Sequence, residues 1–180
     1  VLRETQLVVC LLFQYAGMSF VDFAHLKERN IKNGILDYNR QKTGTPMRLE
    51  ILDTAELMRK ELMGDKKPAS GYLFPFLSGT KTGYEAYLEY NAALSRFNRN
   101  LKALKKAAGI ASDVTSYTIR HSFAMALKEQ NVPIEMISEL LGHKSIKTTQ
   151  IYLRSFSLEK MTEVNSTCFG CVYNYVSKVG

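Results

Sequence analysis

The stretch of residues 115–152 constrains the fold most, because internal stops divide it into three short helices. Thr115 can cap the first helix, whose apolar residues recur at helical spacing. Asn131-Val132-Pro133 ends that helix, since proline cannot continue the hydrogen-bond ladder. A second helix ends at Gly142, as helices commonly do at glycine, and a third carries Tyr152. We therefore expect one compact helical unit.

Three residues of this unit have side chains that suit chemistry at a phosphate, namely Arg120, His143 and Tyr152. Arg120 lies among apolar neighbours, and a part-buried arginine requires an anionic partner. That partner is a structural carboxylate in one interpretation and a phosphate in the other. His143 can donate a hydrogen bond, although an isolated histidine after a helix is usually ordinary surface. Tyr152, taken alone, is most simply a half-buried core residue.

The order of residues in this unit resembles the tyrosine recombinase (phage integrase) family. Arg120-His121, Leu141-Gly142-His143, Thr148-Thr149 and Tyr152 follow one another as the family's motif residues do. The nine-residue step from His143 to Tyr152 is also the family's usual spacing. A lone Arg-His or Leu-Gly-His would mean nothing, but the whole ordered set is hard to reach by chance.

The resemblance implies a fold and a reaction. Over roughly residues 6–163 it implies a catalytic domain of α+β class, mainly helical, with a small antiparallel β-sheet. The implied reaction is site-specific recombination of double-stranded DNA by a homo-oligomer, a tetramer, without a cofactor. Tyr152 would be the nucleophile and form a 3′-phosphotyrosyl intermediate, which splits a difficult step into two easier ones. Arg120 and His143 would stabilise charge on the phosphate.

A β-hairpin is predicted from two alternating segments. Residues 35–40 and 47–52 alternate in the way that half-buried strands do, and residues 41–46 between them are rich in turn formers. Lys42 lies near the tip of this hairpin. A lysine in an exposed turn is usually only solvated. By the resemblance, Lys42 in Lys42-Thr43-Gly44 corresponds to the family's general acid.

Two positions depart from the family's pattern. The family's first phosphate-gripping arginine corresponds to Ser19, which carries no charge and cannot make the bidentate fork of arginine. Asp22 matches an acidic position that is structural in the family. The histidine or lysine expected three residues before Arg120 is Tyr117, whose phenol has a pKa near 10 and cannot shuttle protons as imidazole does. Either another cation takes the role of the missing arginine, or catalysis is impaired.

Three further helices are predicted, over residues 3–16, 53–63 and 84–108. Residues 72–77 are apolar and aromatic, and they form either a third strand or a buried extended segment with Pro75 at an edge. One side of the longest helix carries Tyr87, Tyr90, Asn91, Leu94, Phe97, Leu101 and Leu104.

Basic residues provide candidates for contacts with DNA phosphates. Arg96 and Arg99 lie in the second half of the longest predicted helix, and Lys144 and Lys147 lie beside His143. The alternative for the helix is a solvated face whose aliphatic stems cover apolar surface. A net charge of +7 and a pI of about 9.3 favour a polyanionic partner, either nucleic acid or an anionic membrane surface. No apolar run reaches the roughly 18 residues of a transmembrane helix.

The length of 180 residues with 46% hydrophobic content predicts one soluble domain. We assign residues 1–165 to the catalytic domain and residues 166–180 to a tail that docks on a neighbouring subunit, docks in cis or is disordered. By the resemblance, we expect the family's N-terminal core-binding domain to be absent from this chain.

The cysteine pattern bears on the compartment. Three cysteines are an odd number and indicate a reducing compartment, which for this family is the cytoplasm with the bacterial nucleoid. Cys168 and Cys171 lack the other two ligands of a zinc site, so no metal site is expected.

Two alternatives to a recombinase remain at this point. One is a non-catalytic DNA-binding protein, either a degenerate integrase or a helical repressor. The other is a type IB topoisomerase, which shares the chemistry but relaxes supercoils without synapsis. The reactivity of Tyr152 distinguishes the first alternative from an enzyme.

Overall fold

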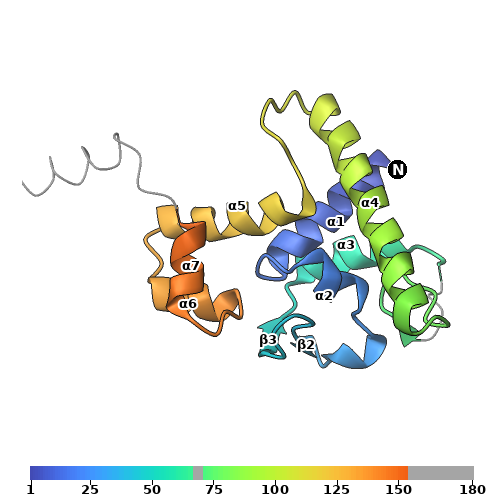
Figure 1. Cartoon of the computed structure of the whole chain (residues 1–180), viewed down its shortest axis with the longest axis horizontal. Coiled ribbons are helices and arrows are strands. Elements are labelled where there is room, and N and C mark those ends of the chain that lie inside the picture. Colours follow the sequence, from blue (N-terminus) through green and yellow to red (C-terminus); the bar gives the residue numbers. More distant parts are fainter. Residues whose placement is uncertain (67–70, 154–180) are drawn as a thin grey trace, which may run out of the picture.

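The computed structural model describes residues 1–66 and 71–153 of the chain (Figure 1). The predictions for the tail, for Cys168 and Cys171 and for the end of the catalytic domain lie outside the described residues. The elements run α1 (Leu2–Gln14), α2 (Phe20–Ala24), a 3-10 turn (Glu28–Asn30), β1 (Ile31–Lys32), β2 (Ile35–Asn39), β3 (Pro46–Glu50), α3 (Asp53–Met63), α4 (Gly83–Ala107), α5 (Ser116–Glu129), α6 (Ile134–Leu140) and α7 (Ile146–Tyr152). This confirms the mainly helical α+β class with a small antiparallel sheet.

Helix α1 lies at the centre of the larger part of the molecule and contacts α3, α4 and α5. Its apolar residues recur every three or four positions, and this stripe is buried as the sequence predicted. The stripe consists of Leu7, Val8, Leu11, Leu12 and Tyr15. None of the described helices is both long enough and apolar enough to cross a membrane.

The sheet has the order β1-β2-β3, and all its described pairs are antiparallel. Leu36 pairs with Leu49 and Tyr38 with Met47, so their side chains share the face that is turned to the core. The predicted hairpin is confirmed, and residues 31 and 32 add the short strand β1. Because side chains alternate along a strand, Arg40 continues the buried face of β2 and is itself 7% exposed.

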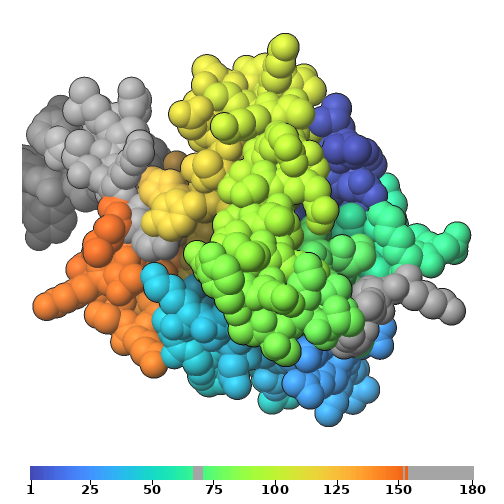
Figure 2. Space-filling model, turned by 45° about the vertical axis from the view of Figure 1, so that its right-hand side comes forward, coloured from blue at the N-terminus to red at the C-terminus, as the bar shows by residue number. Residues whose placement is uncertain are grey.

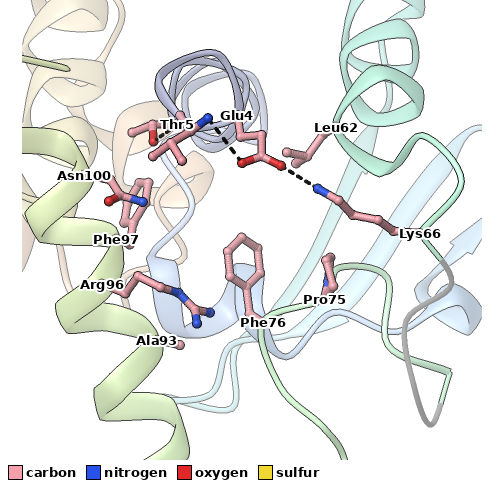
Figure 3. A pocket seen from close by; sticks show the side chains of 11 residues that line it. Glu4, Thr5, Leu62, Lys66, Pro75, Phe76, Ala93, Arg96, Phe97 and Asn100 are labelled. Carbon is pink, nitrogen blue, oxygen red and sulfur yellow. Dashed lines mark hydrogen bonds and ion pairs between the residues drawn. The ribbon is translucent and has the colours of Figure 1, made fainter. Parts of the chain in front are cut away.

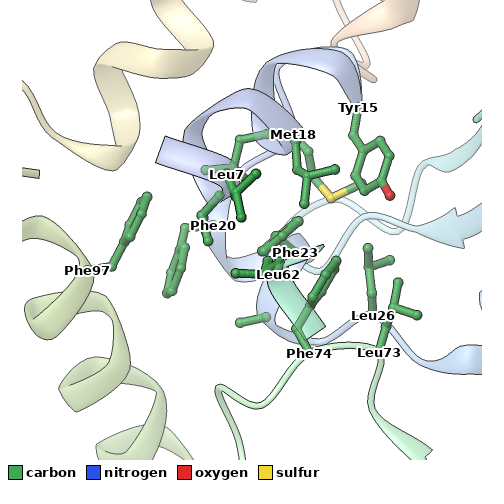
Figure 4. Close-up of a cluster of buried hydrophobic side chains, with 14 of the residues drawn as sticks. Leu7, Tyr15, Met18, Phe20, Phe23, Leu26, Leu62, Leu73, Phe74 and Phe97 are labelled. Carbon is green, nitrogen blue, oxygen red and sulfur yellow. The ribbon is translucent and has the colours of Figure 1, made fainter. Parts of the chain in front are cut away.

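Aromatic rings fill the core between α2, α4 and the segment of residues 72–77 (Figure 4). Phe20 stacks on Phe97 with ring centroids 4.6 Å apart, and Phe23 stacks on Phe74 at 4.1 Å. Of the two alternatives for residues 72–77, the structure has the buried extended segment. Its only described strand-like pairing is a single bridge between Tyr72 and Lys27.

Helix α4 is buried along its middle and second half only. Phe97 and Leu101 pack into the core. Tyr87, which the apolar pattern placed on the same side, is 59% exposed and stacks on Tyr84, so the first turns of α4 extend beyond the core. Periodicity alone could not show where the partner surface of this helix ends.

Helices α5, α6 and α7 form a separate small unit around Ala124, Ile137 and Leu141 (Figure 1). The predicted signals for its ends are confirmed. The Thr115 side chain accepts from the Thr118 backbone N–H at the start of α5, and Gly142 follows α6 with a φ of +61°. A Cβ at residue 142 would lie 2.4 Å from Met47 Sδ and 2.7 Å from Arg40 Cδ. Only glycine therefore lets this unit approach the hairpin, and the two surfaces meet in Figure 2.

The aromatic core yields a stability prediction. Phe23 is fully buried against Phe74, so Phe23→Ala should lower the free energy of unfolding by about 3–5 kcal/mol, through lost burial and the cavity left behind. The exposed Tyr87 is the matched control, and Tyr87→Ala should change the free energy of unfolding by no more than about 0.5 kcal/mol. Urea denaturation measures both values, and equal effects would contradict this view of the core.

Candidate active site

Arg120 lies between the larger core and the small unit of α5, α6 and α7, and its hydrogen bonds connect three parts of the chain. It lies on α5 and is 5% exposed. Its Nη1 donates to the Gly17 carbonyl at 2.9 Å, and its Nη2 donates to the Leu141 carbonyl. Gly17 has a φ of +63°, and a Cβ there would lie 2.9 Å from the Phe123 ring. The close approach of α1 and α5 that positions the guanidinium therefore depends on glycine.

His143 lies beside this guanidinium. Its Nε2 is 3.3 Å from Arg120 Nη2, and its Nδ1 is 2.8 Å from the hydroxyl of Thr149. A guanidinium can only donate, so Nε2 must be the acceptor and the ring hydrogen must lie on Nδ1, where it is donated to Thr149. Arg120 therefore selects the tautomer of His143. Thr149, which is fully buried within α7, stabilises this tautomer as the acceptor and fixes the orientation of the ring.

The charge state of His143 follows from its surroundings. Partial burial, and then the positive charges of Arg120 and Arg40, lower the pKa of His143 to about 4. The imidazole is therefore neutral near pH 7 when no anion is bound. An anion placed between these groups would act in the opposite direction and raise this pKa.

Arg40 is a second buried cation of the site, which the sequence analysis did not single out. Its Nη1 donates to the carbonyls of Leu141 and Gly142, at 3.0 and 3.1 Å. Its Nε lies 3.5 Å from Asp22 Oδ2. The sequence did contain a signal, because Arg40 follows Leu36 and Tyr38 at the period-two spacing of a buried strand face. A charged residue on such a face calls for a partner or a function.

Asp22 connects this cation to the position of the missing arginine. The Ser19 hydroxyl donates to Asp22 Oδ2 at 2.5 Å, and the Gln41 backbone N–H donates to Oδ1 at 2.7 Å. Ser19 also accepts from the Asp22 backbone N–H and caps α2. Asp22 therefore fastens the hairpin to α2, as a structural acid would.

The remaining predicted site residues lie on or next to the elements that carry Arg120, Arg40 and Thr149. Tyr152 is the last residue of α7, one helical turn after Thr149. Lys42 is exposed in the turn that begins at Arg40, and Tyr117 is 60% exposed one turn of α5 before Arg120. Lys144 and Lys147 are exposed before and within the first turn of α7.

The structure does not bring Arg96 to this site. Arg96 lines a cavity of about 410 Å³ with Glu4, Thr5 and Phe76, at the start of α1 (Figure 3). The 13 residues of α1 span about 20 Å, and Gly17 lies beyond the other end. Arg99 is exposed on the same helix as Arg96. A contact of either residue with DNA stays a prediction, separate from the catalytic group.

The family assignment rests on a match over most of the chain. The model of the phage integrase family matches residues 3–159. The chain belongs to this family. Among relatives of this integrase-family chain, the tyrosine recombinase XerD of Lacticaseibacillus casei is 52% identical over 54 residues, which cover 30% of the chain and 18% of that protein. The tyrosine recombinase XerC of Rickettsia typhi is 41% identical over 75 residues, 42% of the chain and 24% of that protein. The chain thus spans a quarter or less of these relatives.

Solved structures share the fold of this integrase-family chain at low identity. XerH recombinase bound to a palindromic difH substrate, in a post-cleavage complex, has a TM-score of 0.66 and 20% identity, and covers 91% of this chain and 45% of that one. The Tn1549 transposon integrase in complex with a circular intermediate DNA has a TM-score of 0.63 and 16% identity. This match covers 89% of the chain described here and 57% of the Tn1549 integrase chain. Both support the fold described above.

The contact between His143 and Thr149 predicts a measurable tautomer. In the wild type, nitrogen NMR shifts of the ring should report hydrogen on Nδ1 at pH 7. Thr149→Val keeps the shape but removes the acceptor, so the Nδ1 tautomer should lose population, whereas Thr149→Ser should retain it. Thr148→Val, at the exposed neighbouring position, is the control. A tautomer that is unchanged in Thr149→Val would contradict the assigned role.

The lowered pKa of His143 predicts a dependence of stability on pH. The unfolded chain has a histidine pKa near 6.5, whereas the folded pKa is about 4. Between these values the unfolded state binds a proton that the folded state does not, so stability falls as the pH falls from about 6.5 toward 4. His143→Gln lacks this contribution, and the wild type should lose stability relative to the variant between pH 7 and 5. Thermal unfolding measures both proteins across this pH range. Equal changes in the melting temperature of wild type and variant between pH 7 and 5 would refute this prediction.

Proposed function

We propose that this protein is a tyrosine recombinase that breaks and rejoins double-stranded DNA at specific sites. The Tyr152 oxygen attacks a phosphodiester, the bond from phosphorus to the 5′-oxygen breaks, and a 3′-phosphotyrosyl intermediate and a 5′-hydroxyl form. The bond energy is kept in the covalent intermediate, so a second 5′-hydroxyl rejoins the strand without a nucleotide cofactor.

The pairing of Arg120 with His143, at the start of the helix that ends in Tyr152, is the observation that carries this proposal. A buried guanidinium and an imidazole that touch each other form a site for an anion, because a negative group between them can accept hydrogen bonds from both. A phosphate oxygen fits this requirement. Backbone carbonyls from residues 17 and 141 hold Arg120 in place before the substrate arrives, as preorganised stabilisation of a transition state requires.

Proton transfer completes the proposed mechanism. A phosphate between the cations raises the pKa of His143, so that the ring can take up a proton and donate a hydrogen bond to a non-bridging oxygen. Lys42, in the exposed turn of the hairpin, protonates the leaving 5′-oxygen as general acid. The proton of the Tyr152 hydroxyl passes to water as its oxygen attacks, while the proton on the new 5′-hydroxyl comes from Lys42. Tyr117, whose neutral phenol can donate a hydrogen bond but cannot shuttle protons as imidazole does, has at most a supporting role at a phosphate oxygen.

Basic side chains near this group of residues bind the DNA backbone through electrostatic attraction. Lys144 and Lys147, exposed near His143, contact the phosphate backbone, with Arg96 and Arg99 as more distant candidates. Each protomer has one Tyr152, and exchange between two duplexes needs four cleavages, so four protomers form a tetramer on paired sites. The DNA complexes of XerH and the Tn1549 integrase support the choice of ligand. We place this reaction in the cytoplasm, at the bacterial nucleoid.

Covalent capture tests the nucleophile. The full-length protein is incubated with a pool of nicked suicide duplexes that carry randomised sites, and DNA linked to protein is recovered after SDS. Wild type should give adducts that share one sequence. Tyr152→Phe, which removes only the attacking oxygen, should give none. Arg120→Ala should lower the adduct yield at least a hundredfold, since one preorganised donor contributes on the order of 3 kcal/mol.

Two results would contradict the proposal. Adducts of equal yield in Tyr152→Phe would mean that another residue reacts. The absence of any wild-type adduct, while salt-sensitive binding to the same pool persists, would favour a DNA-binding protein without catalysis.

A further inference from the structure

Ser19 and Arg40 meet at a single carboxylate oxygen. Asp22 Oδ2 accepts from the Ser19 hydroxyl at 2.5 Å and lies 3.5 Å from Arg40 Nε. The guanidinium of Arg40 therefore lies beside the position from which the sequence pattern led us to expect an arginine. It comes from the hairpin, 21 positions later in the chain than Ser19.

Arg40 also converges on the same acceptor as Arg120. Both guanidinium groups donate to the carbonyl oxygen of Leu141, so two buried cations stand on either side of one small region. Asp22 forms an ion pair with Arg40 at 3.5 Å. Like charges brought together in a medium of low dielectric repel each other strongly. An additional anion placed between them would relieve that repulsion.

We propose that Arg40 replaces the missing arginine, and that together with Arg120 it grips the scissile phosphate of DNA. This inference rests on the proposed recombinase activity. Ser19 leaves room for the guanidinium, and Asp22 aims it through Nε. On binding DNA, Nη1 of Arg40 turns from the carbonyls of Leu141 and Gly142 to a non-bridging phosphate oxygen. Lys42 lies two residues further along the same turn, so one hairpin supplies both a phosphate ligand and the general acid.

A purely structural role makes a different prediction. If Arg40 only braces the hairpin against the Gly142 turn, its loss should weaken cleavage of every substrate alike. If Arg40 neutralises the phosphate, its loss should matter much less when the scissile phosphate carries no charge. A methylphosphonate, in which a methyl group replaces one non-bridging oxygen, removes that charge and leaves the bond that Tyr152 attacks.

The test compares single-turnover cleavage of phosphate and methylphosphonate suicide substrates by the full-length protein. Arg40→Ala should lose at least a hundredfold in rate on the phosphate and less than tenfold on the methylphosphonate, each relative to wild type. Arg40→Gln keeps a donor for the carbonyls but has no charge, and it should behave in the same way even if Arg40→Ala folds poorly. Arg48→Ala is the control, because Arg48 is an exposed arginine of the same hairpin, and it should retain the wild-type rate on both.

Three outcomes are decisive. Selective recovery of Arg40→Gln on the methylphosphonate supports the proposal. Equal losses on both substrates, or no loss on the phosphate, overturn it and leave the recombinase assignment intact. Failure of the wild type to cleave the phosphate substrate at all would overturn the proposed activity and this inference with it.

Discussion

The carbonyl oxygen of Leu141 is the point on which the site depends. It accepts from Arg120 on α5 and from Arg40 at the end of β2, and it is exposed to them because α6 ends there and leaves its last carbonyls without helical partners. A helix end that would otherwise need a cap is thus satisfied by two guanidinium groups. The same contacts fasten the small unit of α5, α6 and α7 to the larger core.

The electrostatics of the site follow from this arrangement. Partial burial, and then the positive charges of the two buried cations Arg120 and Arg40, lower the pKa of His143 to about 4 and keep the imidazole neutral until an anion arrives. The proposed phosphate suits this arrangement, because the same anion that relieves the repulsion between the arginines also favours a proton on His143. Thr149 fixes the starting orientation of the ring from within the helix that carries Tyr152.

The replacement of an arginine by Ser19 has a local explanation in this fold. Ser19 caps α2 and donates to Asp22, so the chain gains a helix cap where a long cationic side chain was expected. The positive charge beside it comes instead from Arg40, held by the same carboxylate. Residues at different positions in the chain can supply a charge to the same place in the fold. What matters at the site is where the guanidinium lies and how it is oriented.

The sequence by itself determined the local elements and the ordered motif. Apolar periodicity located α1, α3 and α5, and alternation located the hairpin. The resemblance of the ordered motif to the phage integrase family made Arg120, His143 and Tyr152 the candidate site residues. These signals are local, since they depend on helix and strand geometry over a few residues. The tertiary structure alone decided that Arg40 reaches Asp22 and Leu141 and that Tyr87 lies beyond the core. Both depend on which distant segments of the chain come into contact, such as residues 40 and 141. A local sequence pattern does not predict such contacts.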